Sequence, residues 1–265
     1  MDDAGRYLLD NQQVEAGSRL DALAQLFNPS TIRHLEGCGL ARGDAVWEVG
    51  AGGPSLPRWL AERVGPTGRV VASDIDTSWL DEVENPRYEV LRHDVATDPP
   101  PDGTFDLVHA RLVLVHVVQR ERALAAMVAA LRPGGWILLE EADPALQPLA
   151  CLDEVGPEQA LANQLKRAFR VLLAERGVDL AFGRTLPRRL RDAGLVEVGS
   201  DASFPVGGPV CDDLERATVE QIRRTLVDRG LATSEEIDRH LASVAAGRLD
   251  LATSPMISAW GRAPG

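Results

Sequence analysis

Apolar residues between positions 45 and 140 form short runs that alternate with segments of helical spacing. Five runs bounded by glycine, proline or polar residues predict buried strands over Ala45–Val49, Arg69–Ser73, Tyr88–Arg92, Phe105–Ala110 and Trp136–Glu140. Two segments have the apolar spacing of helices, Leu56–Val64 and Arg120–Leu131. Strands that alternate with helices predict βαβ units, in which right-handed crossovers place helices on both faces of a parallel sheet.

The remaining chain is predicted to be mainly helical. The first forty residues have helical spacing that Asn28-Pro29-Ser30 interrupts, so we expect two helices there, the second over about Thr31–Gly37. Later helices are expected over Glu158–Arg176, Leu186–Ala193, Cys211–Arg229 and Ser234–Ala246, the last with Ser234 as its N-cap, and strands over Val196–Phe204 and Met256–Arg262. We therefore expect an N-terminal helical lid over residues 1–40 and one domain over residues 41–265, with helical insertions at about 150–190 and 211–246.

The charge balance limits the partners that the protein can bind. There are 40 acidic and 28 basic residues, and the net charge of -12 repels the phosphates of nucleic acids. The longest apolar run, Leu112–Val118, contains His116 and falls far short of the roughly 18–20 residues of a membrane-spanning helix. The N-terminus has no basic segment followed by an apolar one, so no signal peptide is predicted. We expect a cytoplasmic protein that binds neither nucleic acid nor membrane.

Cysteine and histidine are few and scattered along the chain. Cys38, Cys151 and Cys211 form no CxxC pair, and we expect them to be buried, reduced thiols. The histidines show no paired spacing with the cysteines or with one another. We therefore predict neither a structural nor a catalytic metal site.

A glycine-rich turn follows the first predicted strand, in the sequence Glu48-Val49-Gly50-Ala51-Gly52-Gly53-Pro54-Ser55. Between a strand and a helix such a turn lets a ligand approach the backbone, although a purely structural tight turn has the same pattern. A dinucleotide-binding GxGxxG motif would need glycine where Ser55 stands. Glu48 ends a buried strand and needs a hydrogen-bond partner there. Its carboxylate would repel a pyrophosphate but would favour an ammonium or sulfonium group.

Acidic residues follow the second and third predicted strands. Asp74 lies 24 residues after Gly50, a spacing typical of a carboxylate that accepts hydrogen bonds from ribose hydroxyls. Asp76 is the better candidate for a helix N-cap. Asp94 and Val95 follow the third strand, where a carboxylate can accept from an adenine amino group while the next backbone N–H contacts the ring. Loop aspartates without a ligand are also common.

Together these features resemble the class I S-adenosylmethionine-dependent methyltransferases. The motifs that occur in the order and spacing of that family are the glycine turn, Asp74, Asp94-Val95, Phe105-Asp106-Leu107-Val108 and Leu131-Arg132-Pro133-Gly134-Gly135, within about residues 40–142. The resemblance implies a Rossmann-like α/β fold: a seven-stranded, mostly parallel sheet whose last strand is antiparallel, helices on both faces and a helical cap. S-adenosylmethionine would lie across the carboxyl ends of the first strands. The family often has glycine where this chain has Pro54.

The resemblance also implies which residues bind S-adenosylmethionine. Glu48 would face its methionine end, Asp74 would bind the ribose, and Asp94 with Val95 would bind the adenine. The glycines of the turn would line the methionine moiety, and the end of the fourth strand would border the sulfonium and the carboxylate. The implied cofactor-binding residues are Glu48, Gly50, Ala51, Gly52, Asp74, Ile75, Asp94, Val95, Ala110 and Arg111.

The acceptor side is less constrained by sequence. Methyl transfer from a sulfonium is an in-line displacement, and alignment of donor and acceptor alone can contribute roughly 7–11 kcal/mol. His116 follows the fourth strand and is the candidate base, although a histidine there also suits a role in orienting the loop. Five further residues are expected to line the acceptor pocket: Glu140 and Asp143 after the fifth strand, and Tyr7, Asn11 and Arg19 in the N-terminal segment.

The leading hypothesis is therefore an S-adenosylmethionine-dependent methyltransferase acting on a small apolar or aromatic acceptor of the kind found in secondary metabolism. One alternative is a nicotinamide-dependent oxidoreductase, which Ser55 and Glu48 disfavour; another is a non-catalytic binding module that kept the fold. The sequence fits O-, N- and C-methylation equally. Leucine-bearing acidic helices near the C-terminus suit a homodimer face and core packing equally well.

Overall fold

The computed structural model describes residues 8–9, 13–81 and 87–265. They contain a seven-stranded sheet of order β3-β2-β1-β4-β5-β7-β6, in which β7 runs antiparallel to both of its neighbours. The strands are β1 (Ala45–Val49), β2 (Arg69–Asp74), β3 (Glu89–Arg92), β4 (Phe105–Arg111), β5 (Leu131–Ala142), β6 (Val196–Ser203) and β7 (Met256–Arg262). The predicted Rossmann-like, mostly parallel seven-stranded sheet is confirmed.

The chain divides into two compact units. The sheet unit comprises Phe27–Ala142, Phe182–Ser203 and Met256–Gly265. The helical unit comprises Met1–Leu26, Asp143–Ala181 and Phe204–Pro255. This division differs from the expected boundary at residue 40, because the helix α1 (Val14–Gly37) contributes to both units. A lid formed by residues 1–40 stays a prediction.

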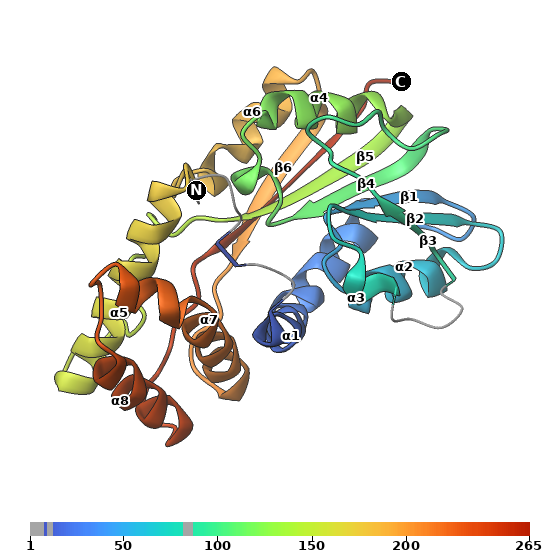
Figure 1. Cartoon of the computed structure of the whole chain (residues 1–265). Coiled ribbons are helices and arrows are strands. Elements are labelled where there is room, and N and C mark those ends of the chain that lie inside the picture. The colour runs from blue at the N-terminus through green and yellow to red at the C-terminus, as the bar shows by residue number, and fades with distance from the viewer. Residues whose placement is uncertain (1–7, 10–12, 82–86) are drawn as a thin grey trace. The chain divides into compact units, whose positions relative to one another are not determined.

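Helices cover both faces of the sheet unit (Figure 1). One face is covered by α2 (Ser55–Val64) and α3 (Ser78–Asp81), and the other by α4 (Arg120–Ala129) and α6 (Leu186–Asp192). Two short 3-10 helices, η1 and η2, span Leu114–His116 and Gly183–Thr185. The core beneath α2 includes Leu56, Leu60, Val46, Ala72, Leu107 and Leu138. Because side chains alternate along a strand, the residues two positions after Val46, Leu107 and Leu138 face this same side of the sheet. Those residues are Glu48, His109 and Glu140.

The N-terminal helix corrects one prediction. The sequence predicts a break at Asn28-Pro29-Ser30, but α1 continues through Pro29 to Gly37. Proline removes a backbone donor and crowds the preceding turn, which usually ends a helix. Here the residues that follow are held by the sheet unit: Thr31 and Leu35 are fully buried, and Ser30 Oγ donates to the Phe27 carbonyl at 2.9 Å. Tertiary contacts therefore outweigh the local breaking signal.

The fifth strand begins earlier than predicted. β5 starts at Leu131, which pairs with Phe105, whereas the sequence predicts a start at Trp136. Pro133, Gly134 and Gly135 form an irregularity inside the paired segment, where the register shifts between Phe105 and Leu107. The strong turn signal of proline and glycine therefore marks a bulge here, not a loop.

The helical unit has a core of its own. It contains α5 (Pro157–Glu175), α7 (Pro209–Asp228) and α8 (Ser234–Ala245). Asn163 is fully buried, and its Oδ1 accepts from the backbone N–H groups of Ala150 and Cys151 at 2.7 and 2.8 Å. A capping box between Thr233 and Glu236 starts α8, so the predicted N-cap at Ser234 is wrong by one residue. None of the helices in the described part of the chain has the length and apolar character needed to cross a membrane.

Candidate active site

The glycine turn lies at the carboxyl end of β1, where the strand order reverses between β2 and β4. Gly50 and Gly52 both have a φ of 63°, a left-handed conformation that favours glycine. The Ala51 N–H donates to the Ser73 carbonyl at 3.0 Å. The Gly52 N–H donates to Asp74 Oδ2 at 2.9 Å. The turn after β1 is therefore fastened to the end of β2, at the position where open α/β sheets bind ligands.

Asp74 is largely buried beside this turn. Its second oxygen, Oδ1, accepts from the Asp76 N–H at 3.0 Å, and burial raises the pKa of the Asp74 carboxyl. Asp76 Oδ1 in turn accepts from the Ser78 N–H at 3.1 Å, so Asp76 binds the first N–H group of α3 from one position before the N-cap, which is Thr77. Ile75, between the two aspartates, is 59% exposed. A carboxylate and an apolar surface therefore stand together at the edge of the sheet.

The predicted adenine-binding pair follows β3 at the same edge. The His93 N–H donates to the Asp74 carbonyl at 2.8 Å, which joins the end of β3 to the end of β2. Asp94 Oδ1 accepts from the Ala96 N–H at 2.9 Å and heads a turn, while Val95 is buried. The structure thus brings the glycine turn, Asp74 and Asp94 to one edge, as the sequence predicts.

The α2 face of the sheet carries a buried polar network centred on His109. On adjacent strands Glu48 and His109 are register partners. His109 Nδ1 lies 2.6 Å from Glu48 Oε2, and His109 Nε2 lies 3.4 Å from Glu140 Oε2. Glu48 was expected to face a ligand; in the structure its Oε2 pairs with this imidazole inside the sheet unit.

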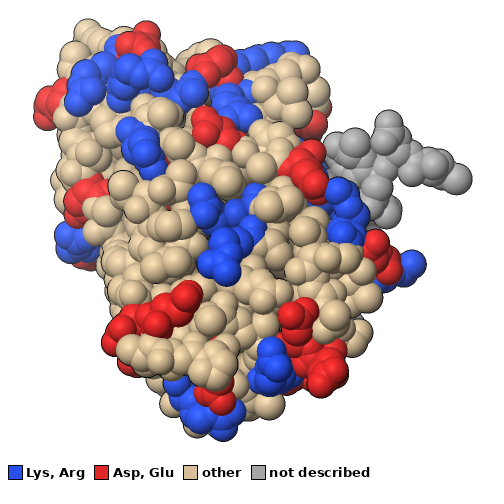
Figure 2. Space-filling model, turned by 90° about the vertical axis from the view of Figure 1, so that its left-hand side faces the viewer, with Lys and Arg blue, Asp and Glu red and all other residues tan. Residues whose placement is uncertain are grey.

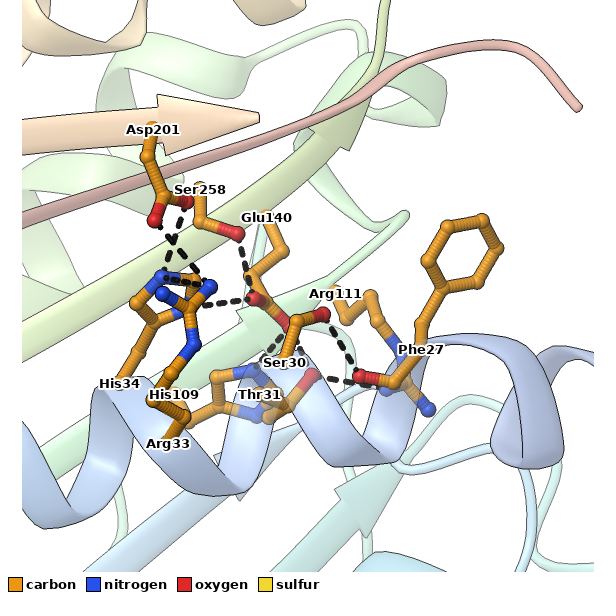
Figure 3. Close-up of polar contacts among 10 residues, drawn as sticks. All are labelled: Phe27, Ser30, Thr31, Arg33, His34, His109, Arg111, Glu140, Asp201 and Ser258. Carbon is orange, nitrogen blue, oxygen red and sulfur yellow. Dashed lines mark hydrogen bonds and ion pairs between the residues drawn. The ribbon is translucent and has the colours of Figure 1, made fainter. Parts of the chain in front are cut away.

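Glu140 links this pair to α1 and to the far strands of the sheet (Figure 3). It is fully buried, its Oε1 accepts from Ser258 Oγ at 2.6 Å, and its Oε2 accepts from Thr31 Oγ1. His34 Nδ1 lies 3.4 Å from Glu140 Oε1, and His34 Nε2 lies 2.9 Å from Asp201 Oδ1. Glu140 was expected to line an acceptor pocket; the structure places its carboxylate inside this network.

The pKa values of the network follow from its charges. Burial alone would lower the pKa of His109, but the charges and hydrogen bonds of Glu48 and Glu140 raise it to about 9. Burial alone would also lower the pKa of His34, but its hydrogen bonds with Glu140 and Asp201 raise that pKa above its usual value. Burial would raise the pKa of Glu140, but hydrogen bonds to His109 and His34 lower it. These shifts favour the charged forms of His109 and Glu140 near neutral pH.

Stability is expected to fall as the pH rises from about 6.5 to 9. A group whose pKa is raised on folding contributes stability below its unfolded pKa and loses that contribution as the pH passes its folded pKa. The pKa of His109 rises from 6.5 to about 9 on folding, and that of Glu141 rises from 4.5 to about 8. Both groups therefore stabilise the folded protein less as the pH rises. Thermal unfolding between pH 5 and 10 should show a midpoint that falls by several degrees over this range. A midpoint that stays level to pH 9 would contradict the charged network.

The segment between β4 and α4 passes beside the glycine turn. A side chain at position 50 would meet Val113, because a Cβ built on Gly50 would lie 2.3 Å from Val113 Cγ2. The predicted base His116 ends η1, and its N–H donates to the Val113 carbonyl at 3.0 Å. Ala110 is buried in β4, and Arg111 Nη1 donates to Thr31 Oγ1 at 3.0 Å.

The other predicted acceptor residues belong to the chain segments of the helical unit. Tyr7 and Asn11 lie outside the described residues. Arg19 and Asp143 are buried residues of the helical unit, where Asp143 Oδ1 accepts from the Leu146 N–H at 2.9 Å. Their role at an acceptor pocket stays a prediction.

The cysteines are free and buried, as predicted. Burial raises the pKa of Cys38 to about 12 and that of Cys151 to about 11, so both are poor nucleophiles at neutral pH. In residues 8–9, 13–81 and 87–265, no group of three or more histidine, cysteine or acidic side chains is arranged to hold a metal ion.

Sequence reasoning missed His109, Thr31 and Ser258 as partners of the two buried glutamates. One signal was available for His109. It stands two positions after Leu107 on a central strand and therefore faces the same side as the inward-pointing Glu48. A histidine and a carboxylate on one face of two buried strands each need a polar partner, because burying either group alone costs free energy, but which residues pair depends on the register of β1 against β4.

Comparisons with known proteins agree with this geometry. Residues 47–139 match the family described as “Methyltransferase domain”. Curated relatives include the ubiquinone/menaquinone biosynthesis C-methyltransferases of Enterobacter sp. (strain 638) and Escherichia fergusonii, which are 34% and 33% identical over 121 residues. Each match covers 42% of this chain and 48% of the relative, so the chain spans about half the length of the curated relatives it matches.

Solved structures share the fold over most of the chain. Phosphoethanolamine N-methyltransferase 2 of Haemonchus contortus, in complex with S-adenosyl-L-methionine, has a TM-score of 0.59 at 14% identity and covers 100% of this chain and 61% of its own. A putative methyltransferase in complex with the Trm112 activator of Haloferax volcanii has a TM-score of 0.57 at 15% identity, covering 95% of this chain and 96% of its own. At these identities the likeness concerns the fold.

Proposed function

We propose that the protein is a class I S-adenosylmethionine-dependent methyltransferase that transfers a methyl group to a small-molecule acceptor; the match of residues 47–139 to the methyltransferase-domain family and the shared fold support this. S-adenosylmethionine is the cofactor of that family, and when bound it supplies a methyl group on a sulfonium. The tasks left to this chain are to bind the cofactor, to orient the acceptor in line with the methyl group and to exclude water.

The observation that carries the proposal is the junction between the glycine turn and Asp74. The Gly52 N–H and Asp74 Oδ2 are joined at 2.9 Å, next to the exposed Ile75. We assign the ribose hydroxyls to the Asp74 carboxylate, an adenine face to Ile75 and the adenine amino group to Asp94. Gly52 fits a ligand close to the backbone, because it lacks a Cβ where the chain is left-handed, whereas the Cβ position of Gly50 is taken up by Val113.

Some predicted residues receive an indirect role in this proposal. Glu48 and Glu140 are buried in the His109 network, so we assign them support of the strand ends and no contact with a ligand. His116 remains the proposed base for acceptors that must lose a proton, because it ends the segment that packs on the glycine turn.

The proposed acceptor is small and apolar or aromatic. The net charge of -12 disfavours a polyanionic acceptor. On the face shown in Figure 2, basic and acidic side chains are interspersed and separated by uncharged surface, without a broad basic stripe. The curated relatives are named for C-methylation in quinone biosynthesis. Incubation with labelled S-adenosylmethionine and panels of phenols, quinols, peptides and RNA tests this, since mass spectrometry identifies the labelled product.

Removal of the Asp74 carboxylate is expected to weaken cofactor binding. Asp74→Ala removes the proposed ribose acceptor and leaves the Gly52 N–H unpaired, which should cost about 1–3 kcal/mol, or roughly 5- to 150-fold in Kd. The measurement is calorimetric titration with S-adenosylhomocysteine. Asp102→Asn is the matched control, because this exposed aspartate precedes β4 at the opposite edge of the sheet. Equal affinities of Asp74→Ala and wild type would remove Asp74 from the site.

A further inference from the structure

A second buried glutamate, Glu141, faces away from the His109 network. It is the last residue but one of β5, is 1% exposed and follows Glu140, so the two side chains point to opposite faces of the sheet. Its Oε1 accepts from the backbone N–H groups of Val113, Leu114 and Val115 at 3.1, 2.7 and 3.3 Å. Three successive N–H groups that converge on one oxygen form an anion-binding nest, which is occupied here by a side chain of the same protein.

The backbone that forms this nest is strained. Leu112, which precedes it, has a φ of 59°, a left-handed value that a leucine rarely adopts. Such a conformation persists only where the surroundings fix it. β5 supplies two of these constraints, because the Leu112 N–H donates to the Glu140 carbonyl at 2.8 Å and the Glu141 side chain holds the next three N–H groups.

The held segment reaches the proposed cofactor site in two ways. Val113 packs so closely on Gly50 that any Cβ at position 50 would lie 2.3 Å from Val113 Cγ2. His116, the proposed base, ends η1, whose first two N–H groups are bound to Glu141. One buried carboxyl group thus fixes the wall of the glycine turn and the backbone that presents His116.

We propose that Glu141 is a positioning residue, which locks residues 112–116 in the strained conformation that shapes the cofactor turn and aims His116. The identity of the ligand rests on the proposed function. The locking of residues 112–116 by Glu141 does not, because it depends only on contacts within the sheet unit.

Glutamine is the informative replacement at this position. Burial raises the pKa of Glu141 to about 8, against the three backbone hydrogen bonds that lower it. Glu141→Gln keeps the shape of the side chain and an oxygen that can accept from the three N–H groups. Glu141→Leu keeps the volume but leaves three N–H groups unpaired. Ile137→Ala is the matched control, because Ile137 is fully buried on the same face of the same strand, four residues earlier.

Amide hydrogen exchange at pH 7 tests the locking directly and needs no ligand. In Glu141→Leu the amides of residues 113–115 should exchange at least tenfold faster than in wild type, while Glu141→Gln stays close to wild type. In Ile137→Ala these three amides should be better protected against exchange than in Glu141→Leu, although the Ile137→Ala variant is itself less stable than wild type. Unchanged protection in Glu141→Leu would overturn the proposal.

Titration with S-adenosylhomocysteine then shows whether the contacts of Glu141 matter for cofactor binding or only stabilise the backbone of residues 112–116. We expect at least tenfold weaker binding by Glu141→Leu and less than threefold change in Glu141→Gln and Ile137→Ala. Faster exchange with unchanged affinity in Glu141→Leu would overturn the positioning role. If wild type itself binds neither S-adenosylhomocysteine nor S-adenosylmethionine, the proposed function fails, and the exchange result alone decides whether Glu141 locks the segment.

Discussion

Replacement of His109 by leucine is expected to destabilise the protein by about 3–5 kcal/mol, the scale seen when one partner of a buried ion pair is removed. The imidazole lies 2.6 Å from Glu48 Oε2 and 3.4 Å from Glu140 Oε2, and all three side chains are buried. Without the imidazole, the buried carboxylates of Glu48 and Glu140 lose a hydrogen-bond partner and a neighbouring positive charge. For a chain of this size the unfolding midpoint should fall by roughly 6–20 °C.

A double-variant cycle supplies the control for this result. Glu48→Gln and His109→Leu each break the pair, so the double variant should be less unstable than the sum of the two single variants. Chemical denaturation at pH 7 measures all four proteins. Strict additivity, or a loss below about 1 kcal/mol in His109→Leu, would show that the network contributes little.

Replacement of Gly50 by alanine is expected to weaken cofactor binding strongly. The residue has a φ of 63°, and a Cβ there would lie 2.3 Å from Val113 Cγ2, so both the turn and the facing segment must move. The left-handed backbone alone costs an alanine roughly 1–2 kcal/mol. We expect the Kd for S-adenosylhomocysteine, measured by calorimetric titration, to rise by more than tenfold.

Gly39→Ala is the matched control for this variant. Gly39 has a φ of 84° but nothing within 4 Å of an added Cβ, so it shares the backbone strain without the clash. The combination of Gly50→Ala with Val113→Ala should restore part of the affinity, because it removes the clashing methyl groups. Binding by Gly50→Ala that matches Gly39→Ala would mean that the close approach of Val113 to the turn does not matter.

Local patterns predict the strands of the sheet well. β1 and β7 have the predicted bounds, because each is a short run with polar residues or glycine at its ends. The glycine turn, Asp74 and Asp94 are likewise local features, since each follows directly on a strand whose carboxyl end meets the same edge. To predict that these features lie together, only the order of the strands in the sheet has to be known.

Features that depend on distant parts of the chain could not be read from the sequence. The pairing of Glu48 with His109 requires the register of β1 against β4, 61 residues apart. The contact of Thr31 with Glu140 spans 109 residues and helps α1 to continue through Pro29. Each of the two units is assembled from three separate segments of the chain, and this division depends on contacts between distant segments, which composition does not reveal.

Thermal unfolding with S-adenosylhomocysteine, S-adenosylmethionine and NAD at matched concentrations tests the central claim most directly. A ligand at 100 times its Kd adds about 2.7 kcal/mol of stability, which should raise the midpoint by roughly 5–11 °C in a protein of this size. The account predicts this shift with the two sulfur ligands and none with NAD. A shift with NAD alone, or with none of the three, would contradict it.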